Sequence, residues 1–195
     1  MGKSIAIFLD RDGTINEEVG YIENLNKFRI IPAAFEAIRL INLSGLQAVV
    51  ITNQAAIAKG LITEAFVGQT HELLQTELKQ KGAAINAFYY CPHHPTEGSS
   101  AYRRICDCRK PAPGLLLQAA REMNIDLSSS YMIGDRYRDM EAAHRAGVKG
   151  VLVKTGYGAD VLANAGPDEE TPAGKPEFIA EDILEAVRWI LRSRQ

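Results

Sequence analysis

Short apolar segments alternate with longer amphipathic segments along most of the chain, and this alternation narrows the folds it can adopt. Apolar runs of strand length are predicted at 4–9, 46–51, 85–90, 131–133, 150–153 and 178–180. Segments with apolar residues at helical spacing are predicted at 32–43, 63–82, 113–123, 137–146 and 182–191. Because such alternation is typical of parallel pairing, the pattern predicts an α/β fold with a parallel sheet covered by helices on both faces.

The size and charge of the chain set limits on its organisation and partners. With 195 residues it is long enough for one well-buried core and rather short for two, so we expect a single domain spanning 1–195. The 22 Lys and Arg residues nearly balance the 24 Asp and Glu residues, so no nucleic acid or acidic membrane is expected as a partner. No apolar surface stripe stands out, and a monomer is expected.

Two further expectations concern targeting and one long segment. No apolar run reaches membrane-spanning length, and the run before Asp10 is too short for a signal peptide, so a cytoplasmic protein is expected. The segment 156–176 is rich in Gly, Ala, Pro and acidic residues. We interpret it as a long surface loop without an assigned role.

Asp10 and Asp12 close the first predicted strand, and Gly13 follows them directly. Residues two apart in a strand point the same way, so the two carboxylates face the same side. Like charges at such a place repel each other, and they need a cation or a proton to coexist. The strand ends of open α/β sheets are also where these folds bind ligands. The pair therefore indicates a metal-assisted active site.

Two further motifs lie near later strands. Thr52, Asn53 and Gln54 follow the second strand, where the threonine hydroxyl could donate a hydrogen bond to a phosphoryl oxygen; an ordinary turn is the alternative. Arg109 and Lys110 come shortly before a predicted helix. Two cations near a helix N-terminus oppose its dipole, and a bound anion would resolve the conflict. The alternative is a solvated basic pair.

Asp135 follows the strand predicted at 131–133, as Asp10 follows the first strand. It can supply the further carboxylate that a Mg²⁺ site prefers. The alternative is a helix N-cap, a position that Asp suits well. Asp139 lies one turn into the next helix, and we interpret it as a group that supports the metal ligands.

All three cysteines belong to one short region of the chain. Cys91 and His93 are followed by Cys106 and Cys108, and three Cys with one His make a complete tetrahedral ligand set for structural zinc. The odd number of cysteines and the expected cytoplasmic location argue against disulfides. Three unrelated thiols are one alternative. A zinc-finger nucleic-acid reader is another, but it would need a basic surface and a recognition helix between the ligand pairs.

Four of these segments together resemble the motifs of haloacid dehalogenase-superfamily phosphatases: Asp10-Arg11-Asp12-Gly13-Thr14, Thr52-Asn53-Gln54, Lys110-Pro111 and Gly134-Asp135. A narrower resemblance, to the heptose bisphosphate phosphatase family, is carried by Glu18-Val19-Gly20-Tyr21, Cys91-Pro92-His93-His94-Pro95 and Cys106-Asp107-Cys108-Arg109-Lys110-Pro111. The related histidinol-phosphatase domain shares the motif order and the zinc ligands, but its zinc loop is typically shorter. The resemblance covers the chain up to about residue 156.

The resemblance implies a Rossmann-like fold with almost no cap domain and a Mg²⁺-dependent phosphomonoesterase. Its substrate would be a small phosphorylated sugar, a heptose 1,7-bisphosphate that loses its C7 phosphate in the synthesis of nucleotide-activated heptose for lipopolysaccharide. Asp10 would be the nucleophile that forms an aspartyl-phosphate, and Asp12 the general acid and base. Thr52 and Lys110 would hold the phosphoryl oxygens. Mg²⁺ would be bound by Asp10, Asp135 and the main-chain carbonyl of Asp12.

The resemblance also implies substrate contacts and a role for zinc. The substrate contacts would come from Arg11, Glu18, Val19, Gly20, Tyr21, Asn53, Gln54, Ala55, Arg109 and Arg136. Zinc on Cys91, His93, Cys106 and Cys108 would shape the loop 91–108 into a partial lid and stay out of the chemistry, because four protein ligands leave no open position. Histidinol phosphate or another small phosphomonoester is the alternative substrate. A non-catalytic zinc-dependent binding module is an alternative of another class.

Overall fold

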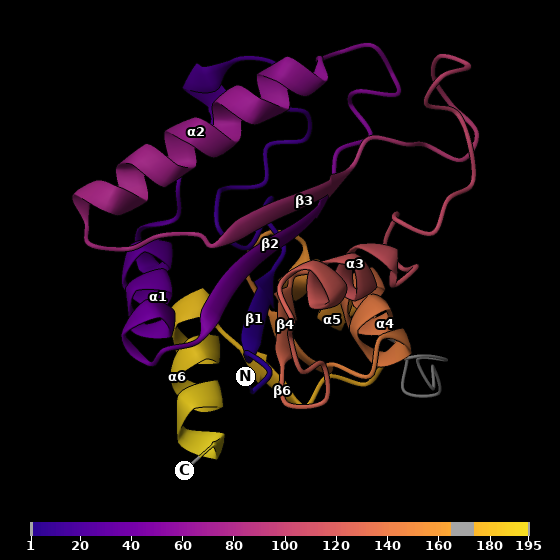
Figure 1. Ribbon diagram of the computed structural model, residues 1–195. Helices are drawn as coiled ribbons and strands as arrows, with labels where there is room; N and C mark the ends of the chain where they lie inside the picture. Colours follow the sequence, from indigo (N-terminus) through magenta and orange to yellow (C-terminus); the bar gives the residue numbers. More distant parts are fainter. Residues whose placement is uncertain (1, 165–173, 195) are drawn as a thin grey trace.

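The computed structural model describes residues 2–164 and 174–194, which form a three-layer α/β fold (Figure 1). The strands are β1 (Ala6–Leu9), β2 (Gln47–Asn53), β3 (Ala87–Cys91), β4 (Tyr131–Gly134), β5 (Lys149–Val153) and β6 (Phe178–Ala180). The helices are the 3₁₀ turn η1 (Leu25–Lys27), α1 (Pro32–Leu43), α2 (Glu64–Gln80), α3 (Gly114–Glu122), α4 (Tyr137–Arg145), α5 (Gly158–Ala163) and α6 (Ile183–Ser193). The predicted strands and helices are confirmed, with ends that differ by at most two residues.

The two faces of the sheet are covered by different helices. Successive strand residues point to opposite faces, so Ile7 and Leu9 pack with α1, α2 and α6, whereas Ala6 and Phe8 pack with α3 and α4. Figure 1 shows α1, α2 and α6 on one side of the strands and α3, α4 and α5 on the other. The prediction of helices on both faces is therefore confirmed, and it explains why the central strands are apolar on every residue.

The order of the strands decides where a ligand can bind. All neighbouring strands are parallel, in the order β3-β2-β1-β4-β5-β6. The chain builds outward from β1 on one side and from β4 on the other, so a crevice forms outside the carboxyl ends of these two central strands. Leu9 pairs with Ile133 across them. The residues that follow β1 and β4 therefore lie next to each other at this crevice.

One expectation about the fold needs correction. The segment 156–176 was expected to be a surface loop, but its first part forms α5 (Gly158–Ala163). The Gly and Ala content of the segment gave no indication of this short helix, which begins against β5. A Cβ at Gly158 would lie 1.8 Å from the carbonyl oxygen of Val153, so only glycine permits this approach. Residues 165–173 of the segment lie outside the described residues.

The helices differ in length and in the number of apolar residues that they carry. Within the described ranges 2–164 and 174–194, no helix is both long enough and apolar enough to span a bilayer. The longest helix is α2, whose buried positions recur along one side only.

Candidate active site

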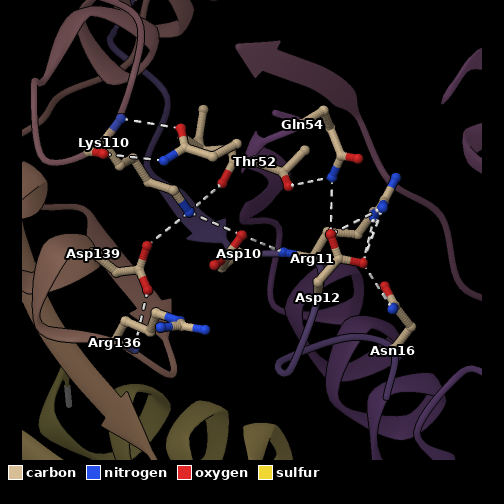
Figure 2. Close-up of polar contacts among 11 residues, drawn as sticks. Asp10, Arg11, Asp12, Asn16, Thr52, Gln54, Lys110, Arg136 and Asp139 are labelled. Atoms are coloured by element: carbon tan, nitrogen blue, oxygen red, sulfur yellow. Dashed lines mark hydrogen bonds and ion pairs between the residues drawn. The ribbon is translucent and has the colours of Figure 1, made fainter. Parts of the chain in front are cut away.

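A buried ammonium group joins two carboxylates at the end of β1 (Figure 2). Lys110 Nζ lies 2.8 Å from Asp10 Oδ1 and 2.7 Å from Asp139 Oδ1, and it donates a hydrogen bond of 2.8 Å to the carbonyl oxygen of Ile51. Lys110 is only 2% exposed, so the alternative of a solvated basic pair is wrong for this residue. The backbone N–H of Arg11 donates to the same Asp10 oxygen over 2.7 Å. Asp10 is thus held in one orientation by two donors.

Burial gives the carboxylates of Asp10 and Asp135 a high proton affinity. Burial raises the pKa of Asp10 to about 6, although the Lys110 charge opposes the shift, and the Asp139 charge adds to it. Burial, followed by the charges of Asp10 and Asp139, raises the pKa of Asp135 to about 7. Burial by itself would lower the pKa of Lys110, but the neighbouring Asp10 and Asp139 raise it. Three carboxylates therefore share one ammonium group, and the cluster lacks positive charge.

The same cluster fits a divalent cation. Asp10, Asp135 and Asp139 each offer a carboxylate oxygen within 4.8 Å of the others. Oδ1 of Asp135 is buried and has no hydrogen-bond partner, whereas Asp139 is already bound by Lys110 and by the backbone N–H of Arg136, which lies 3.1 Å from its Oδ2. Oxygen ligands from Asp are those that Mg²⁺ prefers. Asp10 and Asp135 are therefore the side chains that fit the ion, and Asp139 holds Lys110 beside them.

The loops around Asp135 leave space for its carboxylate only because two residues are glycine. A Cβ at Gly13 would lie 2.3 Å from Asp135 Oδ2, and a Cβ at Gly156 would lie 2.2 Å from the same atom. Both residues have a positive φ, of 84° and 58°, which suits glycine. Asp135 Oδ2 accepts a hydrogen bond of 2.9 Å from the backbone N–H of Tyr157. The N-cap of α4 is Arg136, so the N-cap alternative for Asp135 is wrong.

Asp12 has different surroundings from Asp10. Its carboxylate accepts hydrogen bonds from Arg11 Nη2 at 2.9 Å, from Asn16 Nδ2 at 2.9 Å and from Gln54 Nε2 at 2.8 Å (Figure 2). Burial alone would raise the pKa of Asp12, but the Arg11 charge and the hydrogen bonds from Asn16, Arg11 and Gln54 outweigh it and lower the pKa. In this arrangement Asp12 is the more readily ionised member of the pair.

The residues at the end of β2 connect these groups. Thr52 lies inside β2, so the turn alternative is wrong, and its hydroxyl accepts a hydrogen bond of 3.0 Å from Gln54 Nε2. Asn53 donates to the carbonyl oxygen of Lys110 over 3.0 Å and accepts from the backbone N–H of Lys110 over 3.1 Å. Its side-chain amide therefore fixes the Lys110 segment to β2, a use that the sequence did not indicate.

A cavity of about 320 Å³ opens above this cluster. It brings together many of the residues expected to contact substrate: Arg11, Glu18, Gly20, Tyr21, Asn53, Gln54, Ala55, Arg109 and Arg136. Asp10, Asp12 and Thr52 also line it. Val19, also expected to contact substrate, is 44% exposed and is not among the lining residues. Arg11 is 2% exposed, and its guanidinium bonds Asp12 and the hydroxyl of Thr70.

Four lining residues were missed by sequence reasoning: Ile22, Ala56, Arg138 and Tyr157. Arg138 lies two residues after Arg136, so the basic character of this helix start was the available signal. Tyr157 belongs to the segment interpreted as a loop, and nothing in its neighbourhood marked it.

The four predicted zinc ligands also come together in space. Cys91 Sγ is 3.6 Å from both His93 Nδ1 and Cys106 Sγ, and Cys108 Sγ is 3.2 Å from each of the other sulfurs and 3.3 Å from His93 Nδ1. These separations exceed the disulfide bond length of about 2.05 Å. They approach the edges of a tetrahedron around a metal with bonds of about 2.0–2.3 Å. The alternative of three unrelated thiols is wrong, and the donor set fits zinc.

The zinc-finger alternative is not supported by the loop between these ligands. Residues 92–105 are described throughout and contain turns and the bridge between His94 and Arg103, with no helix. A recognition helix between the ligand pairs is therefore missing from this part of the chain.

Comparison with known proteins agrees with this geometry. A HAD-hydrolase-like family model matches residues 107–186. The D-glycero-beta-D-manno-heptose-1,7-bisphosphate 7-phosphatase of Escherichia coli K12 is 45% identical over 99% of this chain and 92% of its own length, and that of Pasteurella multocida is 46% identical over 77% and 82%.

Solved structures show the same relationship. The D,D-heptose 1,7-bisphosphate phosphatase of B. bronchiseptica, crystallised with magnesium and phosphate, has a TM-score of 0.85 and 30% identity, and the match covers 97% of this chain and 99% of that one. The corresponding enzyme of Burkholderia thailandensis has a TM-score of 0.70 and 25% identity, and the match covers 96% and 99%. With 45% identity to the E. coli relative over nearly the full length of both chains, this chain belongs to the D-glycero-beta-D-manno-heptose-1,7-bisphosphate 7-phosphatase family of HAD-like hydrolases.

Proposed function

We propose that this protein removes the C7 phosphate of D-glycero-D-manno-heptose 1,7-bisphosphate and releases heptose 1-phosphate, a step in the synthesis of nucleotide-activated heptose. The observation that carries the proposal is the position of Asp10. It is held by Lys110 and the Arg11 backbone, lies beside a second carboxylate that lacks a counter-charge, and opens into a cavity with basic walls. This arrangement suits an anionic nucleophile that must approach a phosphate monoester.

Asp10 and Asp12 divide the reaction between them. Asp10 attacks phosphorus, so that a bond from its carboxylate oxygen to phosphorus forms as the bond from phosphorus to the C7 oxygen breaks. Asp12 gives its proton to the leaving oxygen, and afterwards takes a proton from the water that attacks the aspartyl-phosphate. The bonds from Arg11, Asn16 and Gln54 favour its ionised form, the form that accepts a proton. Asp12 therefore has to loosen these contacts before it can act as the acid.

Lys110 and Thr52 stabilise the transferring group. Lys110 brings a positive charge within 2.8 Å of the attacking carboxylate, and Asp139 keeps the ammonium in place. Thr52 accepts a hydrogen bond from Gln54 and still has its own proton to donate to a phosphoryl oxygen. Asp10, Asp135 and the main-chain carbonyl of Asp12 would hold Mg²⁺, which would supply positive charge that offsets repulsion between nucleophile and phosphate. Arg11 positions Asp12, because the buried Arg11 guanidinium forms an ion pair with the Asp12 carboxylate.

The cavity wall favours a substrate with a second anionic group. Arg109 and Arg136 line it, and burial lowers the pKa of Arg109, which also donates a hydrogen bond of 3.1 Å to the carbonyl oxygen of His93. Guanidinium groups bind phosphate in a bidentate manner. Histidinol phosphate has one phosphate and carries an ammonium group, so these arginines do not favour it.

The supporting assignments complete the proposal. Zinc on the three cysteines and His93 is structural, because four protein ligands occupy its coordination positions. The single domain over 1–195, the monomeric state and the cytoplasmic location stay predictions.

A substrate panel tests the proposal. Phosphate release is measured with both anomers of heptose 1,7-bisphosphate, with heptose 7-phosphate and with histidinol phosphate, all with Mg²⁺ present. We expect the highest kcat/KM for one of the bisphosphates, with heptose 1-phosphate accumulating as a stable product. An equal or higher kcat/KM for histidinol phosphate would contradict the proposal. Absence of turnover of every phosphomonoester would instead favour a binding module.

A further inference from the structure

Two arginines lie at the start of α4, and one of them, Arg138, has no role in the function described above. Arg136 is the N-cap of this helix, Arg138 follows two residues later, and both line the cavity. The Nε atom of each is buried without a hydrogen-bond partner. Among the described residues, neither takes part in an ion pair. Within residues 2–164 and 174–194, no hydrogen bond is formed by either guanidinium group, and both side chains line the cavity, so a ligand there can supply the acceptors that the groups lack.

The ring of Tyr157 fixes the direction of Arg136. The guanidinium carbon of Arg136 lies 3.4 Å from the centre of the Tyr157 ring, a close stacking distance for a cation on an aromatic face. Tyr157 follows β5, and its backbone N–H bonds Asp135, so the ring is anchored to the metal side of the cavity. A stacked guanidinium keeps its edge free for a bidentate contact with an oxyanion.

The surroundings of Arg138 contain other positive charges. Arg138 is close enough to Arg109 to lower its pKa, and the charges of Arg136 and Arg138 counter the rise in the pKa of Glu18 that burial causes. The Arg138 charge also opposes the rise in the pKa of Asp10 that burial causes, but the carboxylates of Asp10 and Asp139 are both paired with Lys110. Cations at the first turn of a helix also oppose its dipole. Such a concentration of positive charge needs an anion in the cavity.

We propose that Arg138, together with Arg136 held by Tyr157, binds the phosphate on C1 that is not hydrolysed. This inference rests on the proposed function and assigns two residues to substrate selection, Arg138 as a binding residue and Tyr157 as a positioning residue. The hydrolysed phosphate would instead be held by Asp10, Thr52 and Lys110, a separate set of residues. A substrate with two phosphates therefore engages both groups of residues, and a monophosphate engages only one.

The test compares Arg138→Gln with wild type on two substrates that share the reacting phosphate. We expect KM for heptose 1,7-bisphosphate to rise about 10- to 100-fold, the size expected for lost charge-assisted hydrogen bonds. We expect kcat/KM for heptose 7-phosphate to stay within about twofold, because that substrate lacks the second phosphate. Arg145→Gln is the matched control, since Arg145 lies on the same helix, pairs with Glu141 and should leave both substrates unaffected.

Tyr157 needs a separate pair of variants. Tyr157→Leu removes the ring and should raise KM for the bisphosphate with little change in kcat, whereas Tyr157→Phe keeps the ring and should restore the wild-type value. Binding of heptose 1-phosphate, measured by calorimetry, should weaken in Arg138→Gln and Tyr157→Leu alike. A purely structural role would affect both substrates equally and would not be rescued by Phe.

The outcomes separate this inference from the function on which it rests. If wild type prefers the bisphosphate but Arg138→Gln lowers kcat/KM for both substrates equally, or for neither, the inference is wrong. The proposed function is then unaffected. Wild type that hydrolyses neither heptose phosphate overturns the proposed function and the inference with it. A selective loss on the bisphosphate supports both.

Discussion

Two aspartates of one short motif end up with opposite proton affinities. Asp10 is desolvated next to other carboxylates and its pKa rises to about 6, while Asp12 is surrounded by Arg11, Asn16 and Gln54 and its pKa falls. A pair of carboxylates whose environments separate their pKa values is a common basis for distinct catalytic roles. Here the difference in pKa agrees with the two proposed roles. Asp10 is the attacking group, held beside the Lys110 cation, and Asp12 is the group that exchanges a proton with water.

Replacing Asp12 by Asn should separate the two steps of the reaction. We expect kcat for the heptose bisphosphate to fall about 10²- to 10⁴-fold, because the leaving alkoxide is no longer protonated. With p-nitrophenyl phosphate, whose leaving group needs no proton, the variant should release a burst of one p-nitrophenol per enzyme and then turn over slowly. The burst arises because Asp10 is still phosphorylated but no base activates water. Rapid-mixing absorbance measurements detect it.

The control for this prediction is Asp10→Asn, which should abolish the burst as well as turnover. If Asp12→Asn reduced both substrates by the same factor and gave no burst, Asp12 would not be the proton-transfer group.

Individual site residues could be predicted from the sequence only where position on the fold decides their role. Asp10, Thr52 and Asp135 were found because strand ends meet at one edge of a parallel sheet. The use of Asn53 to hold the backbone of Lys110 could not be found, because the two residues are 57 positions apart and nothing local records the contact. The same applies to Arg138, whose proposed role depends on Tyr157, a residue of a distant segment that stacks on the neighbouring Arg136.

At the level of elements, the zinc loop supports one wall of the cavity. Ser99 donates a backbone hydrogen bond of 2.9 Å to Ala58, and Lys59 pairs with Glu97 over 2.8 Å. Tyr102 donates a hydrogen bond of 2.6 Å to Glu64, the first residue of α2. Two of the contacted residues, Ala58 and Lys59, lie two and three positions after Ala56, which lines the cavity together with Ala55. We therefore expect zinc on the Cys/His cluster to affect substrate affinity more than the reacting atoms.

Loss of one zinc ligand should weaken substrate affinity more than it slows the chemical step. Cys106→Ala is expected to lower the zinc content from one per chain toward zero and to raise KM for the bisphosphate several-fold more than it lowers kcat. Elemental analysis and steady-state kinetics on the same preparation measure both. Ile105→Ala is the matched control, because Ile105 is the neighbouring residue and its side chain is 89% exposed. Wild-type zinc content and KM in Cys106→Ala would contradict the structural-zinc assignment.

The elements that the sequence predicted well are those with a strong pattern of their own. The central strand β1 is apolar throughout, and α6 shows its buried residues at 183, 186, 187 and 190. α5 was missed because it has only six residues and depends on a close approach to β5 that glycine permits. The cluster of Cys91, His93, Cys106 and Cys108 was predicted because residue type and spacing alone indicate it, whereas the contacts that attach its loop to α2 are spread over distant segments.

For the whole molecule, the order of the strands concentrates negative charge in the core. The central pair β1 and β4 brings Asp10 and Asp135 together, and Asp139 follows from α4, with Lys110 as the counter-charge. A raised carboxylate pKa means that the folded state holds its proton more tightly than the unfolded state. Between the ordinary pKa of 3.8 and values of about 6 and about 7, folding then takes up protons, so the metal-free protein loses stability as the pH rises through this range.

This linkage predicts how pH and Mg²⁺ act on unfolding. In EDTA, the Tm of wild type relative to Asp135→Asn should fall as the pH rises from about 4 to about 7.5, because the variant lacks one of the two carboxylates that must be ionised. At pH 7.5, Mg²⁺ at about 100 times its Kd should stabilise wild type by about 2.7 kcal/mol, since it binds only the folded state. That corresponds to roughly 5–10 °C in Tm for a domain of this size. The variant should respond far less.

Scanning calorimetry at several pH values, with Mg²⁺ and with EDTA, measures both effects. An equal dependence of Tm on pH in the two proteins would show that folding does not raise the pKa of Asp135. An equal rise of Tm with Mg²⁺ would show that the ion binds elsewhere.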